Sequence, residues 1–120
     1  MVVGYFPTEQ DSDIQNLWEY LSGSGNQKLY NKVNIFIDKL KEHGLLMNQE
    51  FKSESFKKLD EDLYELRPDS IRITFTVDKY GRAWILTWFK KTSTKTPPSE
   101  IDRANGVKNR VISLVKEGKL

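Results

Sequence analysis

Apolar and polar residues alternate along residues 71–77, and this two-residue period predicts a β-strand with one buried face. Residues 63–67 alternate in the same way, with Leu63, Glu65 and Arg67 on one face and Tyr64 and Leu66 on the other. Residues 83–89 are apolar almost throughout, which is typical of a central strand covered on both faces. Turn-forming residues separate these three segments, so the pattern predicts an antiparallel meander.

Three further segments carry apolar residues at the three- and four-residue spacing of amphipathic helices. The first follows the capping residues Asp11, Ser12 and Asp13, and the second ends at His43 and Gly44. The third begins after Pro97, with Pro98 at the first helical position, and it contains Gly106 in its interior. The apolar positions are Ile14, Leu17, Trp18 and Leu21; Leu29, Val33, Phe36, Ile37 and Leu40; and Ile101, Ala104, Val107, Val111, Leu114 and Val115.

The remaining segments complete a single domain over residues 1–120. Residues 2–6 predict a short N-terminal strand that pairs with the meander, and residues 44–62 predict a long loop in which a strand is possible at 56–59. The order β, α, α, β, β, β, α predicts an α+β fold with a small antiparallel sheet. We expect the helices to pack against one face of this sheet, and Trp84 and Trp88 to share a strand face.

The turn at residues 68–70 predicts an unusual pair of arginines. If Asp69 and Ser70 are its central residues, Arg67 lies directly opposite Arg72 on one face of the sheet. Two like charges in this arrangement destabilise a sheet unless an anion lies between them. The anion is either a ligand phosphate or a local carboxylate, namely Glu65, Asp69 or one of the acidic residues 60–62.

Charge is distributed unevenly along the chain, although the net charge is only +2. Residues 1–62 hold 7 basic and 11 acidic side chains, whereas residues 63–120 hold 12 basic and 6 acidic ones. The basic half includes the meander and the run Lys90, Lys91 and Lys95 that follows it. This asymmetry favours a surface that binds a polyanion, although a basic run is also typical of a solvated face.

Composition excludes several classes of site. The sequence has no cysteine and one histidine, so it contains no disulfide, no cysteine nucleophile and no His-rich metal site, and we expect no cofactor. We expect no membrane association, because no run of about 18 apolar residues is present. The first residues lack the features of a signal peptide, and a reducing cytoplasm is the expected setting.

Several short motifs in residues 63–104 resemble the RelE/HigB superfamily of bacterial toxins, in particular its phage-derived Gp49-like branch. That branch typically has a strand ending in Glu-Leu-Arg, an arginine in the next strand, a third strand ending in an aromatic residue and lysines, and a Lys-Thr-Pro segment before a helix. Here these motifs are Glu65-Leu66-Arg67, Ile71-Arg72-Ile73, Trp88-Phe89-Lys90-Lys91 and Lys95-Thr96-Pro97, with Glu100, Ile101 and Ala104 in the helix.

The resemblance implies a ribosome-dependent endoribonuclease that cleaves mRNA without a metal, by attack of the 2′-hydroxyl on the adjacent phosphate. It implies catalytic roles for Arg67, Arg72, Lys90 and Lys91. Lys95, Lys57 and Lys58 are the candidates for binding the RNA backbone. The implied partners are the ribosome with its mRNA and a helix-turn-helix, HigA-like antitoxin, which would form a heterotetramer through antitoxin dimerisation.

The sequence departs from the family pattern at one position that matters for chemistry. The best-studied branch has lysines in the first meander strand, where this chain has Tyr64 and Glu65. The general base and general acid therefore stay unassigned. Two other functions fit the same basic face: a module that binds nucleic acid without cleaving it, and a domain that binds only an acidic protein partner.

Overall fold

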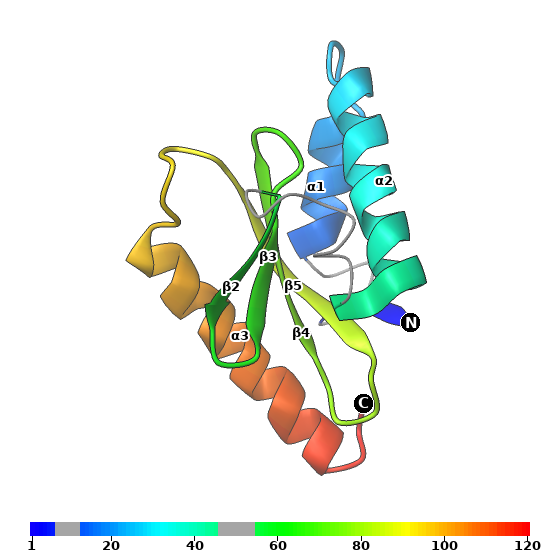
Figure 1. Cartoon of the computed structure of the whole chain (residues 1–120), viewed down its shortest axis with the longest axis vertical. Coiled ribbons are helices and arrows are strands. Elements are labelled where there is room, and N and C mark those ends of the chain that lie inside the picture. The colour runs from blue at the N-terminus through cyan, green and yellow to red at the C-terminus, as the bar shows by residue number, and fades with distance from the viewer. Residues whose placement is uncertain (7–12, 46–54) are drawn as a thin grey trace.

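The computed structural model describes residues 1–6, 13–45 and 55–120, and it confirms the α+β class (Figure 1). Its elements are β1 (Val3–Tyr5), α1 (Asp13–Leu21), α2 (Gln27–His43), β2 (Phe56–Asp60), β3 (Leu63–Leu66), β4 (Ile71–Val77), β5 (Ala83–Lys90) and α3 (Pro98–Lys116). The predicted cap residues Asp11 and Ser12 lie outside the described residues, as does most of the predicted loop before β2. None of the helices in the described ranges is long and apolar enough to cross a membrane.

The five strands form one sheet in the order β1-β5-β4-β3-β2. The predicted meander β3-β4-β5 is confirmed, and β2 extends it as an antiparallel edge strand. The expectation of a purely antiparallel sheet was wrong at the other edge, because β1 runs parallel to β5. Gly4 lies opposite Trp84 there, and a Cβ atom at Gly4 would lie only 2.7 Å from the indole ring. A glycine therefore allows β1 to lie beside that large side chain.

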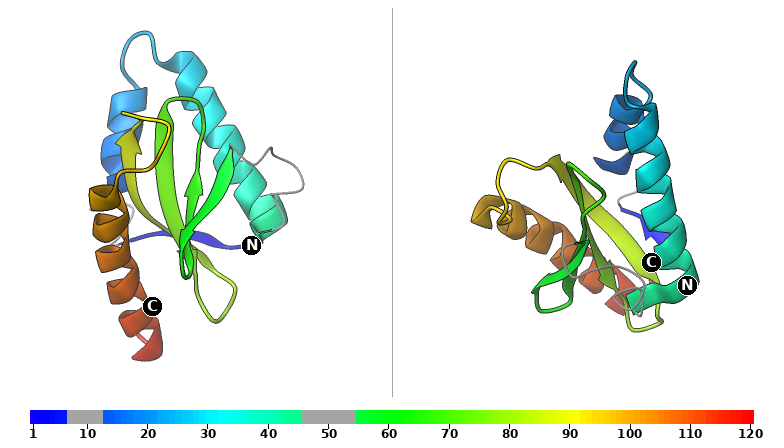
Figure 2. Two further views of the ribbon diagram at one scale, coloured as in Figure 1. Left: turned by 60° about the vertical axis from the view of Figure 1, so that its left-hand side comes forward. Right: turned by 45° about the horizontal axis from the view of Figure 1, so that its top comes forward.

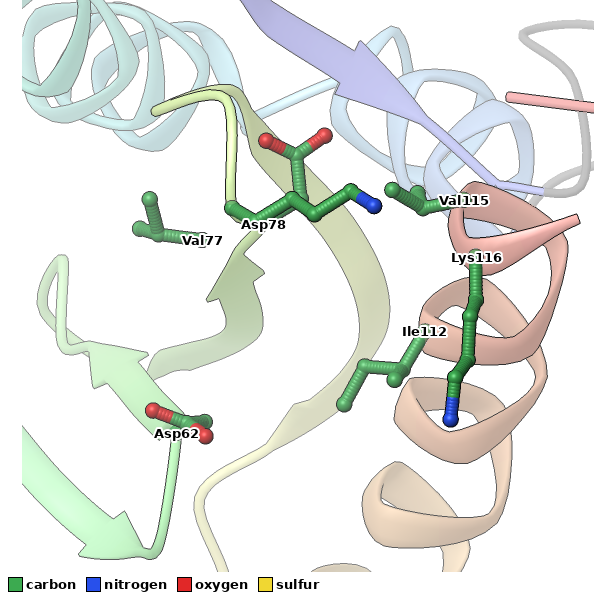
Figure 3. Close-up of a pocket in the computed structure, with 7 residues that line it drawn as sticks. Asp62, Val77, Asp78, Ile112, Val115 and Lys116 are labelled. Atoms are coloured by element: carbon green, nitrogen blue, oxygen red, sulfur yellow. The ribbon is translucent and has the colours of Figure 1, made fainter. Parts of the chain in front are cut away.

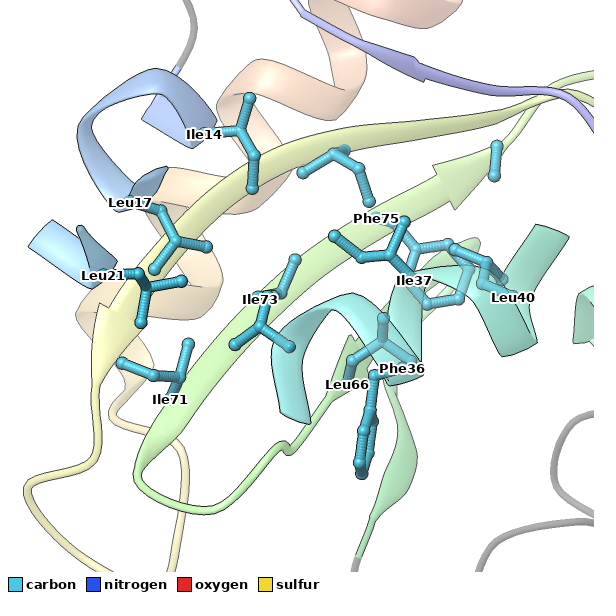
Figure 4. Close-up of a cluster of buried hydrophobic side chains, with 13 residues drawn as sticks. Ile14, Leu17, Leu21, Phe36, Ile37, Leu40, Leu66, Ile71, Ile73 and Phe75 are labelled. Atoms are coloured by element: carbon cyan, nitrogen blue, oxygen red, sulfur yellow. The ribbon is translucent and has the colours of Figure 1, made fainter. Parts of the chain in front are cut away.

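The helical hairpin α1–α2 covers one face of the sheet, and the larger cluster of buried side chains lies between them (Figure 4). The alternation in the sequence explains why this face is apolar, because the odd-numbered apolar residues of β4 all point toward the hairpin. Its central members are Ile14, Leu17 and Leu21 of α1, Phe36, Ile37 and Leu40 of α2, and Leu66, Ile71, Ile73 and Phe75 of the sheet.

The third helix covers the opposite face, so the expectation that all helices lie on one face was wrong (Figure 2). Leu63 and Leu86 of the sheet pack with Ala104, Val111 and Val115 of α3 in a second, smaller cluster. Helices on both faces are what the apolar run of β5 requires, since a strand with apolar residues in both directions needs cover on both sides.

A β-bulge in β5 corrects another expectation. Thr74 pairs with Thr87 while the next residue, Phe75, pairs with Ile85, so one extra residue is inserted in β5 at this point. As a result Trp84 packs against the α3 cluster, whereas Trp88 packs against the hairpin cluster and stacks on Tyr20. The two tryptophans thus lie on opposite faces of the sheet.

The turn between β4 and β5 is organised around Asp78, whose side chain is 2% exposed. Its carboxylate accepts hydrogen bonds from the backbone N–H groups of Tyr80 and Arg82, from Arg82 Nε and from Trp84 Nε1. Burial raises the pKa of the Asp78 carboxyl, but these hydrogen bonds outweigh burial and leave the pKa below its ordinary value.

The lowered pKa of Asp78 predicts an acid-dependent contribution to stability. A carboxyl whose pKa is lower in the folded state stabilises that state above its unfolded pKa, near 4, and the contribution disappears as pH falls through the folded pKa. We expect Asp78→Asn to lower the free energy of unfolding at pH 7, and we expect the difference from wild type to shrink as pH falls below about 4. Urea unfolding at a series of pH values measures this, and an equal destabilisation at every pH would contradict it.

Helix α3 runs without interruption through Gly106, which is exposed. A Cβ atom at this position would meet no neighbouring atom within 4 Å, so nothing in the fold requires glycine. We expect Gly106→Ala to stabilise the protein by about 0.5–1 kcal/mol, because alanine loses less backbone entropy in a helix. Thermal unfolding checks this, and a lower melting temperature in the variant would be the contrary result.

Candidate functional site

The two arginines predicted to face each other do so at the end of the sheet where β3 turns into β4. Leu66 pairs with Ile73, and the same register continued by one step sets Arg67 opposite Arg72. Between them the backbone N–H of Ile71 donates to Pro68 O, and Asp69 adopts a positive φ of 57°. The predicted turn is therefore confirmed, and both arginines are largely buried, with 9% and 7% of their surface exposed.

Arg67, directly after β3, is paired with a carboxylate of that strand. Its Nε lies 2.6 Å from Glu65 Oε1, and the Glu65 side chain is fully buried. Arg67 Nη2 also donates to Thr94 O at 3.4 Å and to Thr96 Oγ1 at 3.3 Å. Of the carboxylates considered from the sequence, Glu65 is thus the local anion for Arg67.

Arg72 has a different environment, with no carboxylate partner in the part of the chain that the structure describes. Its Nη1 donates to the backbone carbonyls of Asp69 at 2.7 Å and Ile71 at 2.9 Å. Burial lowers the pKa of the Arg72 guanidinium, the charge of Arg67 lowers it further, and Glu65 and Asp69 partly offset this. Arg72 stays a cation at neutral pH, and its Nε and Nη2 make no hydrogen bond to a described residue.

The lysines at the end of β5 and in the loop after it do not all share the face of the arginines. Lys90 pairs with Ile71 across the sheet, and its Nζ lies 4.0 Å from the ring centroid of Tyr20, on the side of the helical hairpin. Lys91 is exposed, and its backbone N–H donates to Ser70 O beside the turn. Strand alternation carried one residue past Lys90 sets Lys91 on the side of Arg72. Lys95 is exposed in the following loop.

The two lysines of β2 point to opposite faces of the sheet. Lys57 pairs with Glu65 and so belongs to the face of the arginines, whereas Lys58 pairs with Tyr64 and belongs to the hairpin face. Both are exposed. The structure therefore gathers Arg67, Arg72, Lys91 and Lys57 on one face at one end of the sheet, and it directs Lys90 and Lys58 away from them.

Sequence reasoning missed the role of Thr96. Its hydroxyl lies 3.0 and 2.9 Å from the two oxygens of Glu65 and links the loop at residues 91–97 to the sheet. Thr96 belongs to the Lys-Thr-Pro motif, but a threonine in a loop carries no sequence signal of a partner 31 residues away. A buried pair of threonine hydroxyls, Thr74 and Thr87, lies deeper on the same face.

A pocket of about 540 Å³ lies at the other end of the sheet, between the β4–β5 turn and the last turns of α3 (Figure 3). Ile112 and Val115 of α3 line it on one side, and Asp62, Val77 and Lys116 also line it (Figure 3). It includes none of the candidate basic residues. Among the residues described, no three His, Cys, Asp or Glu side chains are grouped so as to hold a metal ion.

Comparison with known proteins gives one family. The family model described as phage-derived protein Gp49-like matches residues 15–109 of the 120 residues, a range that includes most of α1, all of α2, β2 to β5 and α3 up to residue 109. A search of curated proteins finds no match to this chain. The matched range contains every candidate basic residue and the loop that follows β5.

Proposed function

Because this chain belongs to the phage-derived Gp49-like family, a toxin-like family of toxin–antitoxin systems, we propose that it is a toxin that cleaves mRNA on the ribosome. The proposal extends the family relationship to the RelE/HigB superfamily, in agreement with the motifs from Glu65 to Pro97 and with the small α+β fold. The observation that supports it most is Arg72, a nearly buried cation with no carboxylate partner among the described residues.

Arg72 has the properties that a phosphate site needs. Its guanidinium is fixed by two backbone carbonyls through Nη1, which leaves Nε and Nη2 for two parallel hydrogen bonds to phosphate oxygens. Only 7% of the Arg72 surface is exposed, so its surroundings have a lower effective dielectric constant than open solvent, and an ionic hydrogen bond here is stronger than at an open surface. Lys91, and Lys57 on the far strand, add positive charge on the same side of the sheet.

The proposed reaction needs no metal. The 2′-oxygen forms a bond to the neighbouring phosphorus as the bond from phosphorus to the 5′-oxygen breaks, which leaves a 2′,3′-cyclic phosphate and a 5′-hydroxyl. A base takes the proton of the 2′-hydroxyl, and an acid gives one to the 5′-oxygen. Arg72 would stabilise the additional negative charge on the phosphoryl oxygens in the transition state.

The experiment compares ribosome-bound and free mRNA as substrates for the purified protein. We expect cleavage of translated mRNA within the coding sequence, with cyclic phosphate and 5′-hydroxyl ends. Induced expression in a bacterium should arrest growth and produce new mRNA ends. If the protein binds RNA but leaves every substrate intact, it is a binding module, and the proposal fails.

We also propose the partners that accompany this activity. They are the ribosome with its mRNA and a helix-turn-helix, HigA-like antitoxin that dimerises and so holds two toxins in a heterotetramer. Co-expression with the product of an adjacent helix-turn-helix gene tests this assignment. A complex of two plus two chains by light scattering, together with restored growth, is the expected result, and persistent growth arrest would contradict it.

A further inference from the structure

Glu65 is a fully buried carboxylate in the middle of a sheet face, and its partners among the described residues are Arg67, directly after β3, and Thr96 of the loop at residues 91–97. A buried charge destabilises a fold unless it is paired and hydrogen-bonded. Here Arg67 supplies the opposite charge and Thr96 supplies a hydroxyl donor. The carboxylate therefore joins two segments that are 31 residues apart in the sequence.

Arg67 completes this connection. Its Nε is bound to Glu65, and its Nη2 reaches two loop groups, the carbonyl oxygen of Thr94 and the hydroxyl of Thr96. The Thr96 hydroxyl thus accepts a hydrogen bond from Arg67 and donates one to Glu65, so this hydroxyl acts as both acceptor and donor. Two of the three nitrogens of Arg67 are occupied within the protein, and its charge is balanced by Glu65.

The loop held in this way carries two of the candidate lysines, Lys91 from the catalytic set and Lys95 from the RNA-binding set. It begins at Lys91, whose backbone N–H is bonded to Ser70 O at the β3–β4 turn, and it ends at Pro97, where α3 starts (Figure 2). Lys91 lies exposed at the first attachment, and Lys95 lies exposed next to Thr96 at the second. Their position over the sheet therefore depends on the bonds of Glu65, Arg67 and Thr96.

We propose that Glu65, Arg67 and Thr96 form a latch that holds the loop 91–97 against the sheet and so positions Lys91 and Lys95 for RNA. Arg67 is then a positioning residue that does not touch the phosphate, and Arg72 is the arginine that does. The role of the loop in binding RNA rests on the proposed function. The latch between the loop and the sheet does not depend on that function.

Glu65→Gln distinguishes this role of Arg67 from direct contact with phosphate. If Arg67 bound phosphate directly, neutralising Glu65 would free it and preserve or improve RNA binding. If the latch is correct, the same change loosens the loop and weakens RNA binding. A matched control is Glu61→Gln, which removes the same charge from an exposed side chain in the turn after β2.

Thr96→Val tests the latch without altering any charge. We expect trypsin to cleave after Lys91 and Lys95 about tenfold faster in this variant than in wild type, because the loop opens locally more often. We expect the KM for mRNA on programmed ribosomes to rise about five- to fiftyfold while kcat changes less than about threefold, since ordered lysines contribute uniform binding. Thr96→Ser restores the hydroxyl and should behave as wild type, and Thr92→Val is the control in the same loop.

Each outcome decides a separate point. Unchanged trypsin cleavage in both Glu65→Gln and Thr96→Val would overturn the latch. Faster trypsin cleavage with an unchanged KM would show that the loop does not position RNA ligands, and the proposal would also fail. If wild type cleaves no mRNA, the proposed function fails. The trypsin result still decides whether the latch exists. Retention of the variants on programmed ribosomes then decides whether the latch serves RNA binding.

Discussion

Arg72→Ala is expected to lower kcat for mRNA cleavage by at least about a hundredfold, the effect of removing one preorganised donor to a developing anion. Arg72→Lys should retain part of the activity, because a lysine keeps the positive charge but has no planar fork for two phosphate oxygens. Cleavage of mRNA on programmed ribosomes under single-turnover conditions measures both variants.

The control for Arg72→Ala is Arg110→Ala, which removes an exposed arginine from α3. It should cleave mRNA at the wild-type rate. Circular dichroism must show that Arg72→Ala is folded, because Arg72 also donates to two backbone carbonyls at the turn. A folded Arg72→Ala protein with wild-type kcat would remove Arg72 from the reaction, and the phosphate site would have to be sought elsewhere on the basic face.

The opposition of Arg67 and Arg72 was predictable from the sequence because it depends only on local rules. A short turn fixes the register of its two strands, and alternation then decides which side chains share a face. The same reasoning correctly separated Leu63 from Leu66, which lie in different clusters of the core. Both helix stripes of the hairpin followed from the spacing of apolar residues in the same way.

Three features depend on contacts distant in sequence, and local patterns did not reveal them. The parallel pairing of β1 with β5 joins residues about 80 positions apart. The bulge opposite Thr74 and Phe75 reverses the faces of the strand beyond it, which separated Trp84 from Trp88. The apolar run of β5 did indicate cover on both faces, but it could not say that α3 alone would supply the second layer.

The basic residues of the candidate site were visible in the sequence, whereas their division of roles was not. Arg67 and Arg72 are equivalent by position, since each ends or begins a strand at one turn. The two arginines differ because Glu65 lies two residues before Arg67 on the same face and pairs with it. The loop then brings Thr96 into contact with Glu65 and Arg67. The path of that loop is a tertiary feature. The sequence alone therefore could not show that Arg67 is paired with a carboxylate while Arg72 is not.

Arg67→Ala is expected to lower the free energy of unfolding by about 3–5 kcal/mol, because it leaves the fully buried carboxylate of Glu65 without its cation. This corresponds to a melting temperature lower by more than about 10 °C. Loss of activity in this variant would therefore not show that Arg67 touches RNA. Urea unfolding of Arg67→Ala beside Arg110→Ala, which should cost less than about 1 kcal/mol, measures the difference.

The double variant Arg67→Met with Glu65→Met separates the cost of an unpaired charge from the value of the pair. Replacing both members of a buried ion pair by apolar residues of similar size is often close to neutral, so the double variant should be more stable than Arg67→Ala. If it regains stability but the loop 91–97 stays sensitive to trypsin, the pair serves mainly to position the loop. If Arg67→Ala alone is as stable as wild type, the buried Glu65 does not depend on the charge of Arg67, and the latch loses its electrostatic basis.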